Sequence, residues 1–258
     1  MTPERHVLIT GASGGIGRAL ALEYAAPETL LSLCGRRLDA LRETGGLAEA
    51  QGARCRLAAF DVRDFAALRG FIEEAQAAAP LSLLFANAGV CYGTREDGLE
   101  TLEECRETLE VNAEAAIVTA LLGAKAMLPQ KSGRIALVSS QAGKLPLVFT
   151  PSYCASKGAV RLYGLSLRES LLSRGIKVTT IAPGYVASPM SARFLGFAPW
   201  FWSDAKAARH VRRKLAKGPR TISFPFLMNA LIAALPILPG PLRSRLLKFF
   251  SFKVAERS

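Results

Sequence analysis

The sequence predicts an α/β fold: a doubly wound parallel sheet of about seven strands, with helices on both faces. Two observations lead to this prediction. Short apolar segments alternate with longer amphipathic segments through most of the 258 residues, and a glycine-rich turn follows the first apolar segment. Parallel strands are buried on both faces and are therefore apolar throughout. Their alternation with helices predicts a sheet that helices cover on both sides.

Seven segments have the composition of buried strands. Each is short and apolar on both faces, and a turn or a helical pattern separates it from the next. Six of them are residues 6–10, 30–34, 55–60, 81–86, 134–139 and 177–182, and residues 220–224 could supply a seventh strand.

Six amphipathic segments between these strands predict helices. Their apolar residues recur with the helical period, as expected for helices that pack on a sheet. They span roughly residues 15–26, 38–50, 64–78, 101–128, 152–173 and 203–216. Doubly wound sheets bind ligands beyond the carboxyl ends of their strands, so functional residues are expected in the loops that follow the strands.

Composition limits the class of protein. Half of the residues are hydrophobic and 21% are charged, which suits a folded domain. The apolar run at the N-terminus is too short for a secretory signal. The five cysteines are odd in number, scattered and without C-x-x-C spacing, which argues against disulfides or a zinc site and favours a reducing cytoplasm. With only His6 and His210 available, we expect no metal centre.

The net charge of +12 is concentrated near the C-terminus. Residues 205–258 contain twelve Lys and Arg residues but one acidic residue, Glu256. This basic excess lies beside a strongly apolar stretch, a pairing that favours contact with an anionic membrane surface. We therefore expect no specific nucleic-acid partner.

A glycine-rich loop, TGASGGIG at 10–17, follows the first predicted strand and opens the first predicted helix. Glycines let the backbone turn tightly and approach a pyrophosphate, and a helix N-terminus supplies N–H donors to it. A tight turn with close helix–sheet packing is the alternative interpretation. The candidate cofactor-binding residues here are Gly11, Ser13, Gly14, Ile16 and Gly17.

The loop after the second predicted strand indicates which dinucleotide binds. An acidic residue there would suit the ribose 2′-OH of NAD(H), whereas a 2′-phosphate needs a cation. The sequence has Arg36 and Arg37, and no acid before Asp39. A guanidinium–phosphate contact contributes about 1.5–3 kcal/mol. We therefore predict NADP(H) rather than NAD(H), with Arg36 the better candidate; the alternative is that both arginines are solvated residues at a helix start.

The loops after the third and fourth predicted strands add further candidates. Asp61, followed by Val62, could accept a hydrogen bond from the adenine amino group or cap the next helix. After the fourth strand, Asn87, Ala88 and Gly89 are small enough for a cofactor ribose to lie against the backbone.

A serine, a tyrosine and a lysine follow the fifth predicted strand. Tyr153 comes thirteen residues after Ser140, and Lys157 follows four residues later. Residues four apart share one helix face, so the phenol and the ammonium point the same way. A nearby positive charge favours the phenolate and lowers the tyrosine pKa. Tyr153 could then exchange a proton with a carbonyl or an alcohol while Ser140 holds the substrate oxygen. An ordinary Tyr/Lys pair on a helix surface is the alternative.

Taken together, these motifs resemble the short-chain dehydrogenase/reductase family, in its shorter single-domain branch. TGASGGIG at 10–17, NAG at 87–89, Asn112, SSQAG at 139–143, YCASK at 153–157 and PGYVASPM at 183–190 match that branch in order and at fitting intervals. The resemblance covers about residues 6–190 and implies a Rossmann-type fold.

The resemblance also implies a role for each matching residue. Tyr153 would be the acid/base, Ser140 would anchor the substrate oxygen, and Lys157 would bind the nicotinamide ribose and depress the tyrosine pKa. Asn112 matches the residue of a water-linked proton relay to the lysine. The segment lining the nicotinamide is matched by Pro183, Gly184, Val186 and Ser188, with Ser188 in place of the usual threonine.

The chain departs from the family's pattern after about residue 190. It lacks the glycine-rich V-D-G-G segment and ends in a basic tail rich in proline and phenylalanine. We expect residues 1–190 to form the dinucleotide-binding and catalytic core. Residues 191–258 would form a substrate lid and a basic, apolar C-terminal extension of the same single domain.

An aromatic cluster in residues 191–202 favours a hydrophobic substrate, such as a lipid, sterol or acyl compound. Packing of this loop on the protein's own core or on a membrane is the alternative. The cluster consists of Phe194, Phe197, Trp200, Phe201 and Trp202.

The C-terminal tail has no spanning segment. Residues 222–242 are almost wholly apolar, but prolines, Asn229 and Gly240 interrupt them. After them Leu242, Leu246, Phe249 and Phe250 share one helical face, a pattern typical of an interfacial amphipathic helix. Peripheral membrane contact, an oligomer interface and intramolecular packing remain alternatives.

The sequence thus predicts an NADP(H)-dependent oxidoreductase that interconverts a carbonyl and an alcohol on a hydrophobic substrate. A non-catalytic NADP(H)-binding sensor or scaffold at a membrane is the alternative. Dehydration or epimerisation of a nucleotide sugar is disfavoured by the short chain and the TGxxxGxG spacing. We expect a cytoplasmic homodimer or homotetramer, associated with the inner face of a membrane if the tail contacts one.

Overall fold

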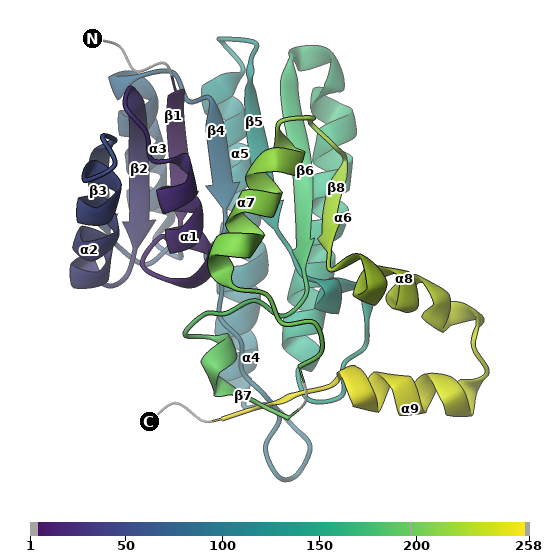
Figure 1. Cartoon of the computed structure of the whole chain (residues 1–258). Coiled ribbons are helices and arrows are strands. Elements are labelled where there is room, and N and C mark those ends of the chain that lie inside the picture. The colour runs from purple at the N-terminus through teal and green to yellow at the C-terminus, as the bar shows by residue number, and fades with distance from the viewer. Residues whose placement is uncertain (1–4, 197, 256–258) are drawn as a thin grey trace.

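A seven-stranded sheet forms the centre of the molecule in the computed structural model, which describes residues 5–196 and 198–255 except for the side chains of Pro236, Phe249 and Phe250. The strand order is β3-β2-β1-β4-β5-β6-β8, and every pair is parallel (Figure 1). This sheet confirms the predicted fold class. The strands are β1 (Arg5–Thr10), β2 (Thr29–Gly35), β3 (Arg54–Ala59), β4 (Leu83–Ala86), β5 (Gly133–Val138), β6 (Ile176–Pro183) and β8 (Thr221–Phe224).

Helices cover both faces of the sheet (Figure 1). On one face α1 (Gly15–Tyr24), α2 (Leu38–Glu49) and α7 (Asp204–Leu215) enclose one apolar core. On the other, α3 (Phe65–Ala78), α5 (Ala115–Met127) and α6 (Pro151–Leu171) enclose a second core. Each predicted strand and helix lies within a few residues of an observed one, because their strong apolar periodicity reflects burial against the sheet.

The long helix predicted over residues 101–128 is divided in the structure. It consists of α4 (Leu102–Leu109), a π-helical turn η1 (Glu110–Glu114) and α5. Thr101 caps its start by accepting a hydrogen bond from the Glu104 amide. Single π-turns inside α-helices are often found at functional sites, and this one contains Asn112.

The strand order reverses between β1 and β4, so the loops after these two strands diverge and leave a crevice at the carboxyl edge of the sheet. Four short 3-10 turns also occur in the described structure, and two of them lie in the loops after β5 and β6. The four turns are η2 (Gln141–Lys144), η3 (Leu172–Arg174), η4 (Ser191–Arg193) and η5 (Leu235–Ile237).

The C-terminal part adds elements that the sequence did not predict. Helix α8 (Phe226–Ala234) follows β8, and the two-residue strands β7 (Phe194–Leu195) and β9 (Lys253–Val254) pair antiparallel. The predicted amphipathic helix is present as α9 (Gly240–Phe250). Figure 1 shows α8 and α9 projecting as a hairpin from the side of the sheet where β8 lies. In the described part of the chain, no helix has the length and apolarity needed to cross a membrane.

Part of the tail packs inside the protein. Leu246 and Leu247 of α9 contact an apolar cluster, and Phe252 is buried within it. The Phe252 ring stacks on Phe194, with centroids 4.0 Å apart, and meets the Tyr185 ring edge-on. Intramolecular packing therefore accounts for this portion of the tail. The predicted contributions of Phe249 and Phe250 fall outside the described side chains.

Candidate active site

The glycine loop is shaped by close packing against the protein itself. A Cβ at Gly17 would lie 2.2 Å from the Gly11 carbonyl oxygen, and one at Gly11 would lie 2.7 Å from the Ala88 Cα. Gly11 also has a φ of +69°, which favours glycine. Gly14 differs, since a Cβ there would meet the Arg37 guanidinium at an ordinary 3.5 Å. Close packing therefore accounts for Gly11 and Gly17 but does not require glycine at position 14, and cofactor binding by the loop stays a prediction.

Helix α1 begins with free donors facing this loop. Gly14 is its N-cap residue, and no side chain of the described structure caps the helix. The first N–H groups of a helix have no intrahelical partner, and the helix dipole favours an anion beside them. The sequence therefore folds locally into a site suited to a phosphate group.

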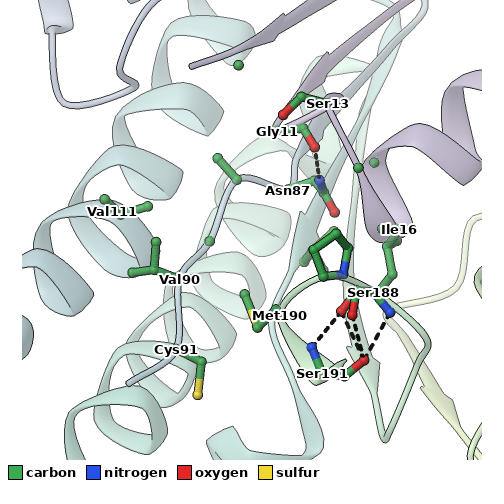
Figure 2. A pocket seen from close by; sticks show the side chains of 18 of the residues that line it. Gly11, Ser13, Ile16, Asn87, Val90, Cys91, Val111, Ser188, Met190 and Ser191 are labelled. Atoms are coloured by element: carbon green, nitrogen blue, oxygen red, sulfur yellow. Dashed lines mark hydrogen bonds between the residues drawn. The ribbon is translucent and has the colours of Figure 1, made fainter. Parts of the chain in front are cut away.

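Asn87 holds the glycine loop in place, a role that the sequence did not indicate. Its side-chain amide donates to the Thr10 carbonyl oxygen at 2.9 Å. It also donates to the Gly11 carbonyl oxygen at 3.3 Å, the bond drawn in Figure 2. The Thr10 hydroxyl oxygen accepts the backbone N–H groups of Asn87 and Ala88. These bonds tie the end of β4 to the end of β1, across the point where the strand order reverses.

A cavity of about 480 Å³ opens at this edge of the sheet. Every predicted cofactor-binding residue lines it, although these residues come from loops after β1, β2, β3, β4 and β6 and from α6. The predicted residues on its wall are Gly11, Ser13, Gly14, Ile16, Gly17, Arg36, Arg37, Asp61, Val62, Asn87, Ala88, Gly89, Ser140, Tyr153, Lys157, Pro183, Gly184, Val186 and Ser188.

The two arginines occupy different surroundings on the cavity wall. Arg36 forms an ion pair with Glu107 at 3.2 Å and approaches Asp61 at 4.0 Å. Arg37 donates to the Ser13 carbonyl oxygen at 3.1 Å, beside Gly14. The positive charge of Arg36 is thus compensated by nearby carboxylates, whereas Arg37 lies directly against the glycine loop.

Asp61 does not cap the helix that follows it. Asp64 is the N-cap of α3 and accepts the amides of Ala66 and Ala67. The Asp61 carboxylate is instead held by Arg63, with its Nη2 at 2.8 Å. The hydrogen bond from the Arg63 side chain lowers the pKa of Asp61, against a smaller opposing effect of burial. Asp61 is therefore an ionised acceptor on the cavity wall, and the helix-cap alternative is wrong.

Ser140, Tyr153 and Lys157 converge at the inner end of the cavity. Ser140 lies after β5 as the N-cap of η2, and its hydroxyl accepts the Ala142 amide at 3.1 Å. Tyr153 and Lys157 lie one turn apart on α6, with the lysine Nζ 5.9 Å from the tyrosine ring centroid. The Lys157 ammonium is buried, 4% exposed, and donates to the Val138 carbonyl oxygen at 3.0 Å. The predicted triad is thus assembled from β5 and α6.

Burial dominates the electrostatics of this cluster. It lowers the pKa of Lys157 to about 8. It also raises the pKa of Tyr153 well above its ordinary value, with buried Cys91 acting in the same direction and the Ser140 hydrogen bond acting against it. For the chain alone, desolvation therefore raises the tyrosine pKa, and its depression by Lys157 and the oxidised cofactor stays a prediction for the cofactor complex. Tyr153 is a protonated phenol at neutral pH.

Asn112 lies behind the cavity rather than on its wall. It is fully buried in η1, where its Oδ1 accepts the Val90 amide at 2.7 Å and its Nδ2 donates to the Val90 carbonyl at 2.8 Å. Its Nδ2 also donates to the Ser156 hydroxyl at 3.2 Å. Asn112 therefore ties the loop after β4 to α6. The relay role implied by the resemblance stays a prediction.

Ser188 turns out to be part of a serine pair. Its hydroxyl and backbone N–H bond to the side chain of Ser191, and the Ser191 hydroxyl reaches the Val186 carbonyl oxygen at 2.8 Å (Figure 2). Ser191 opens η4 and lines the cavity, but no motif in the sequence pointed to it. The pair fixes the conformation of the loop after β6, which lies close to Gly15 of the glycine loop.

A second, smaller pocket adjoins the first. Both are lined by Ser140, Tyr153, Gly184 and Phe194, so the tyrosine lies where the two meet. The other walls of the second pocket are mostly apolar and come from distant parts of the chain. They are Gln141, Ala142, Leu145, Leu147, Tyr185, Met228, Ile232 and Phe252.

The predicted aromatic lid is only partly present. Phe194 lines both pockets, whereas the Trp202 ring stacks on Phe224 with centroids 4.9 Å apart and packs on the core. Trp200 and Phe201 are exposed, and Phe197 lies outside the described residues. The sequence missed Phe252, which takes the lid position from the C-terminal tail.

Comparison with known proteins places this geometry in a family. A model of the short chain dehydrogenases matches residues 5–195. The chain belongs to this family. It is 32% identical to an uncharacterized oxidoreductase of Myxococcus xanthus over 92% of the chain and 94% of that protein. It is 31% identical to the ketoacyl reductase HetN of a Nostoc species, over 70% of the chain and 63% of that protein.

Solved structures of short-chain dehydrogenases share the fold. The short chain dehydrogenase of Mycobacterium paratuberculosis, bound to NAD, superposes with a TM-score of 0.76 at 27% identity. The superposition covers 86% of the chain and 96% of the Mycobacterium protein. As a short-chain dehydrogenase, the protein is an NAD(P)-dependent oxidoreductase. The uncapped N-terminus of α1 and the cavity of about 480 Å³ fit a nicotinamide dinucleotide.

Proposed function

We propose that this protein is an NADP(H)-dependent oxidoreductase that interconverts a carbonyl and an alcohol on a hydrophobic substrate. One observation carries the proposal. Tyr153 and Ser140 lie at the junction of the cofactor-sized cavity and the apolar pocket, the place where a substrate carbonyl would face the cofactor. Among the described residues, those that line the smaller pocket include no charged side chain, which suits an uncharged, apolar substrate.

Each of the site residues then has a separate role in the proposed reaction. The nicotinamide, when bound, donates or accepts the hydride. The protonated Tyr153 phenol donates its proton to the substrate oxygen during reduction and recovers it in the opposite direction. Ser140 donates a hydrogen bond to the same oxygen. Lys157 supplies a positive charge that stabilises the phenolate after the proton has left.

Activity over a graded set of ketones tests this function. We expect NADPH oxidation to increase along a panel ordered by chain length and ring count. Tyr153→Phe should lose at least about 1,000-fold in kcat, because the proton donor is gone, while keeping its NADPH Kd and its melting temperature. Full activity of Tyr153→Phe would contradict the mechanism. Tight NADPH binding without turnover by the wild type would favour the sensor or scaffold alternative.

The arginines after β2 support NADP(H) over NAD(H). Both line the cavity, and Arg37 lies against the glycine loop. We expect Arg36→Ala and Arg37→Ala each to raise the KM for NADPH at least about tenfold, since each removes a charge-assisted contact to the 2′-phosphate. The KM for NADH should change less than about twofold. Arg18→Ala, a nearby arginine paired with Glu43, is the matched control, and equal losses with both cofactors would contradict the assignment.

We further propose that the outer face of α8 and α9 contacts an anionic membrane. Phe226 is 81% exposed and Ile237 is 84% exposed, and Leu227, Leu231 and Leu242 are exposed beside them. The inner face of α8 lines the apolar pocket with Met228 and Ile232, so the same helix would separate the bilayer from the substrate. Residues 205–255 contain no acid, and two copies meeting at this face would repel each other.

Vesicle flotation tests the membrane contact. We expect the wild type to bind vesicles of phosphatidylcholine with phosphatidylglycerol more strongly than vesicles of phosphatidylcholine alone. Phe226→Ser with Ile237→Ser should abolish binding. The control is Leu102→Ser with Leu162→Ser, two exposed leucines on other helices. A dimer that these serine substitutions dissociate, without any vesicle binding, would instead assign the face to a second copy.

A further inference from the structure

Gln141 carries an amide that has no partner in the described structure. The residue is 3% exposed, and both its Nε2 and its Oε1 are buried without a hydrogen bond. Buried polar groups are nearly always paired, and each unpaired one costs about 1–3 kcal/mol. An apolar side chain of similar size would avoid this cost. Stability therefore does not account for glutamine at this position.

Gln141 lies beside the residues that we propose bind the substrate. It follows Ser140 directly and is the first residue of η2. It lines the smaller pocket together with Ser140 and Tyr153. Two other described side chains, Arg56 and Thr180, also have buried, unpaired polar atoms. Neither of them lines the cavity or the smaller pocket. The orphaned amide is thus a feature of the substrate site.

The chemistry of the pocket limits what can satisfy this amide. Ser140 and Tyr153 are committed to the reacting oxygen in the proposed function, so the amide is available to a second polar group on the same molecule. Adjacent Cα atoms are about 3.8 Å apart, which means that this group is close to the reacting carbonyl. Since no charged side chain lines the pocket, a carboxylate would be desolvated without compensation. The second group is therefore neutral.

We propose that Gln141 is a specificity-determining residue that hydrogen-bonds a second, uncharged polar group next to the reacting carbonyl. The substrate class would then be a hydrophobic ketone with a neighbouring ester, thioester, amide or hydroxyl. This inference rests on the proposed function and makes it more specific, because it distinguishes such bifunctional ketones from simple ones. An amide can both donate and accept, so it accommodates either kind of neighbouring group.

Matched substrates and one near-isosteric variant test the inference. We compare a long-chain methyl ketone with a β-keto ester of the same length, using the wild type and Gln141→Met. For the keto ester, kcat/KM should fall at least about tenfold in the variant, which corresponds to about 1.4 kcal/mol. For the methyl ketone it should change less than twofold. The melting temperature of the variant should be equal to or above that of the wild type, since an unpaired amide has been removed.

Three outcomes would overturn the inference. Equal losses on both substrates would assign Gln141 to general packing, and a lowered melting temperature would assign it a structural role. If Gln141→Met reduced the keto ester as well as the wild type does, the amide would have no part in specificity. Reduction of the methyl ketone by the wild type tests the proposed function separately. If the wild type reduces neither ketone, the proposed function fails and this inference fails with it.

Discussion

At the scale of single residues, the candidate site buries a charged side chain. This burial costs stability, but the proposed chemistry requires the charge at that place. Lys157 is enclosed although its charge is poorly solvated there, and burial lowers its pKa to about 8. Among the described residues, the Lys157 ammonium donates a hydrogen bond to the Val138 carbonyl oxygen. A buried charge with so little compensation destabilises the fold. The lysine is therefore retained for function at the expense of stability.

Replacing this lysine should stabilise the protein. The ordinary lysine pKa of 10.5 exceeds the folded value of about 8, so the unfolded chain binds the proton more tightly. The free-energy cost of burying the charged lysine is fully present below about pH 8. The wild type therefore gains stability as the pH rises from about 8 to 10.5. We expect Lys157→Met to be about 1–3 kcal/mol more stable at pH 7 and to lose this advantage above pH 10. Urea denaturation at both pH values measures it, without added cofactor.

The comparison between wild type and variant isolates Lys157. Burial also lowers the pKa of Lys144 to about 8, but that residue is unchanged in both proteins. Lower stability of Lys157→Met at pH 7 would mean that the hydrogen bond to Val138 outweighs the desolvation penalty. Lys157→Met should lose activity whether its stability rises or falls. A more stable but inactive variant would show that the lysine lowers stability and is required for function.

At the scale of elements, the glycines of the first loop serve two different purposes. Gly17 allows α1 to pack on the loop, because a Cβ there would overlap the Gly11 carbonyl. A Cβ at Gly14 would make only ordinary contacts with Arg37 and Pro189, and Gly14 has an extended φ of 170°. Gly17 is needed by the protein's own backbone, whereas we propose that Gly14 keeps the helix N-terminus accessible to the cofactor.

Alanine at these two positions should separate the two purposes. We expect Gly17→Ala to lower the free energy of unfolding by at least about 2 kcal/mol, since backbone atoms must move to relieve the overlap. Gly14→Ala should change it by less than about 1 kcal/mol while raising the NADPH Kd at least about tenfold. Thermal unfolding and NADPH fluorescence titration measure the two effects. Similar stabilities of the two variants would contradict this division of roles.

Other elements of the site depend on contacts that are distant in sequence. The π-turn η1 brings Asn112 to the Val90 backbone, and β9 brings Phe252 onto Phe194. The helical pattern predicted one continuous helix over 101–128, because a π-turn keeps the backbone helical and depends on a change in hydrogen bonding that local composition does not reveal. A two-residue strand such as β9 is too short to produce a periodic signal.

At the scale of the whole molecule, the region after the family match is part of the core. Ala207, Ala208 and Val211 of α7 are buried against the sheet, and α7 packs on α1. Ile222 and Phe224 of β8 complete the same core. The sequence predicted residues 1–190 as a core and 191–258 as an extension of one domain, and from these contacts we expect the two parts to unfold as a single cooperative unit.

Truncation tests this prediction. We expect a chain that ends at residue 195, where the family match ends, to lack a cooperative thermal transition, because removing β8 and α7 exposes one side of the sheet. A chain ending at residue 238, which keeps both elements, should still unfold cooperatively at a lower temperature. Circular dichroism during heating distinguishes them. A cooperative transition in the shorter chain would show that the first 195 residues fold independently.

The sequence by itself determined the fold class, the family and many of the residues on the cavity wall, although it missed Ser191. Buried parallel strands must be apolar throughout, and the loops after them must meet at one edge, so local patterns and spacing were sufficient. Only the tertiary structure decided which residues enclose the substrate pocket, how burial sets the pKa of Tyr153, and that the Gln141 amide is unpaired. Burial and hydrogen-bond partners are properties of three-dimensional surroundings, and residues such as Phe252 reach the site from more than fifty positions beyond the last motif.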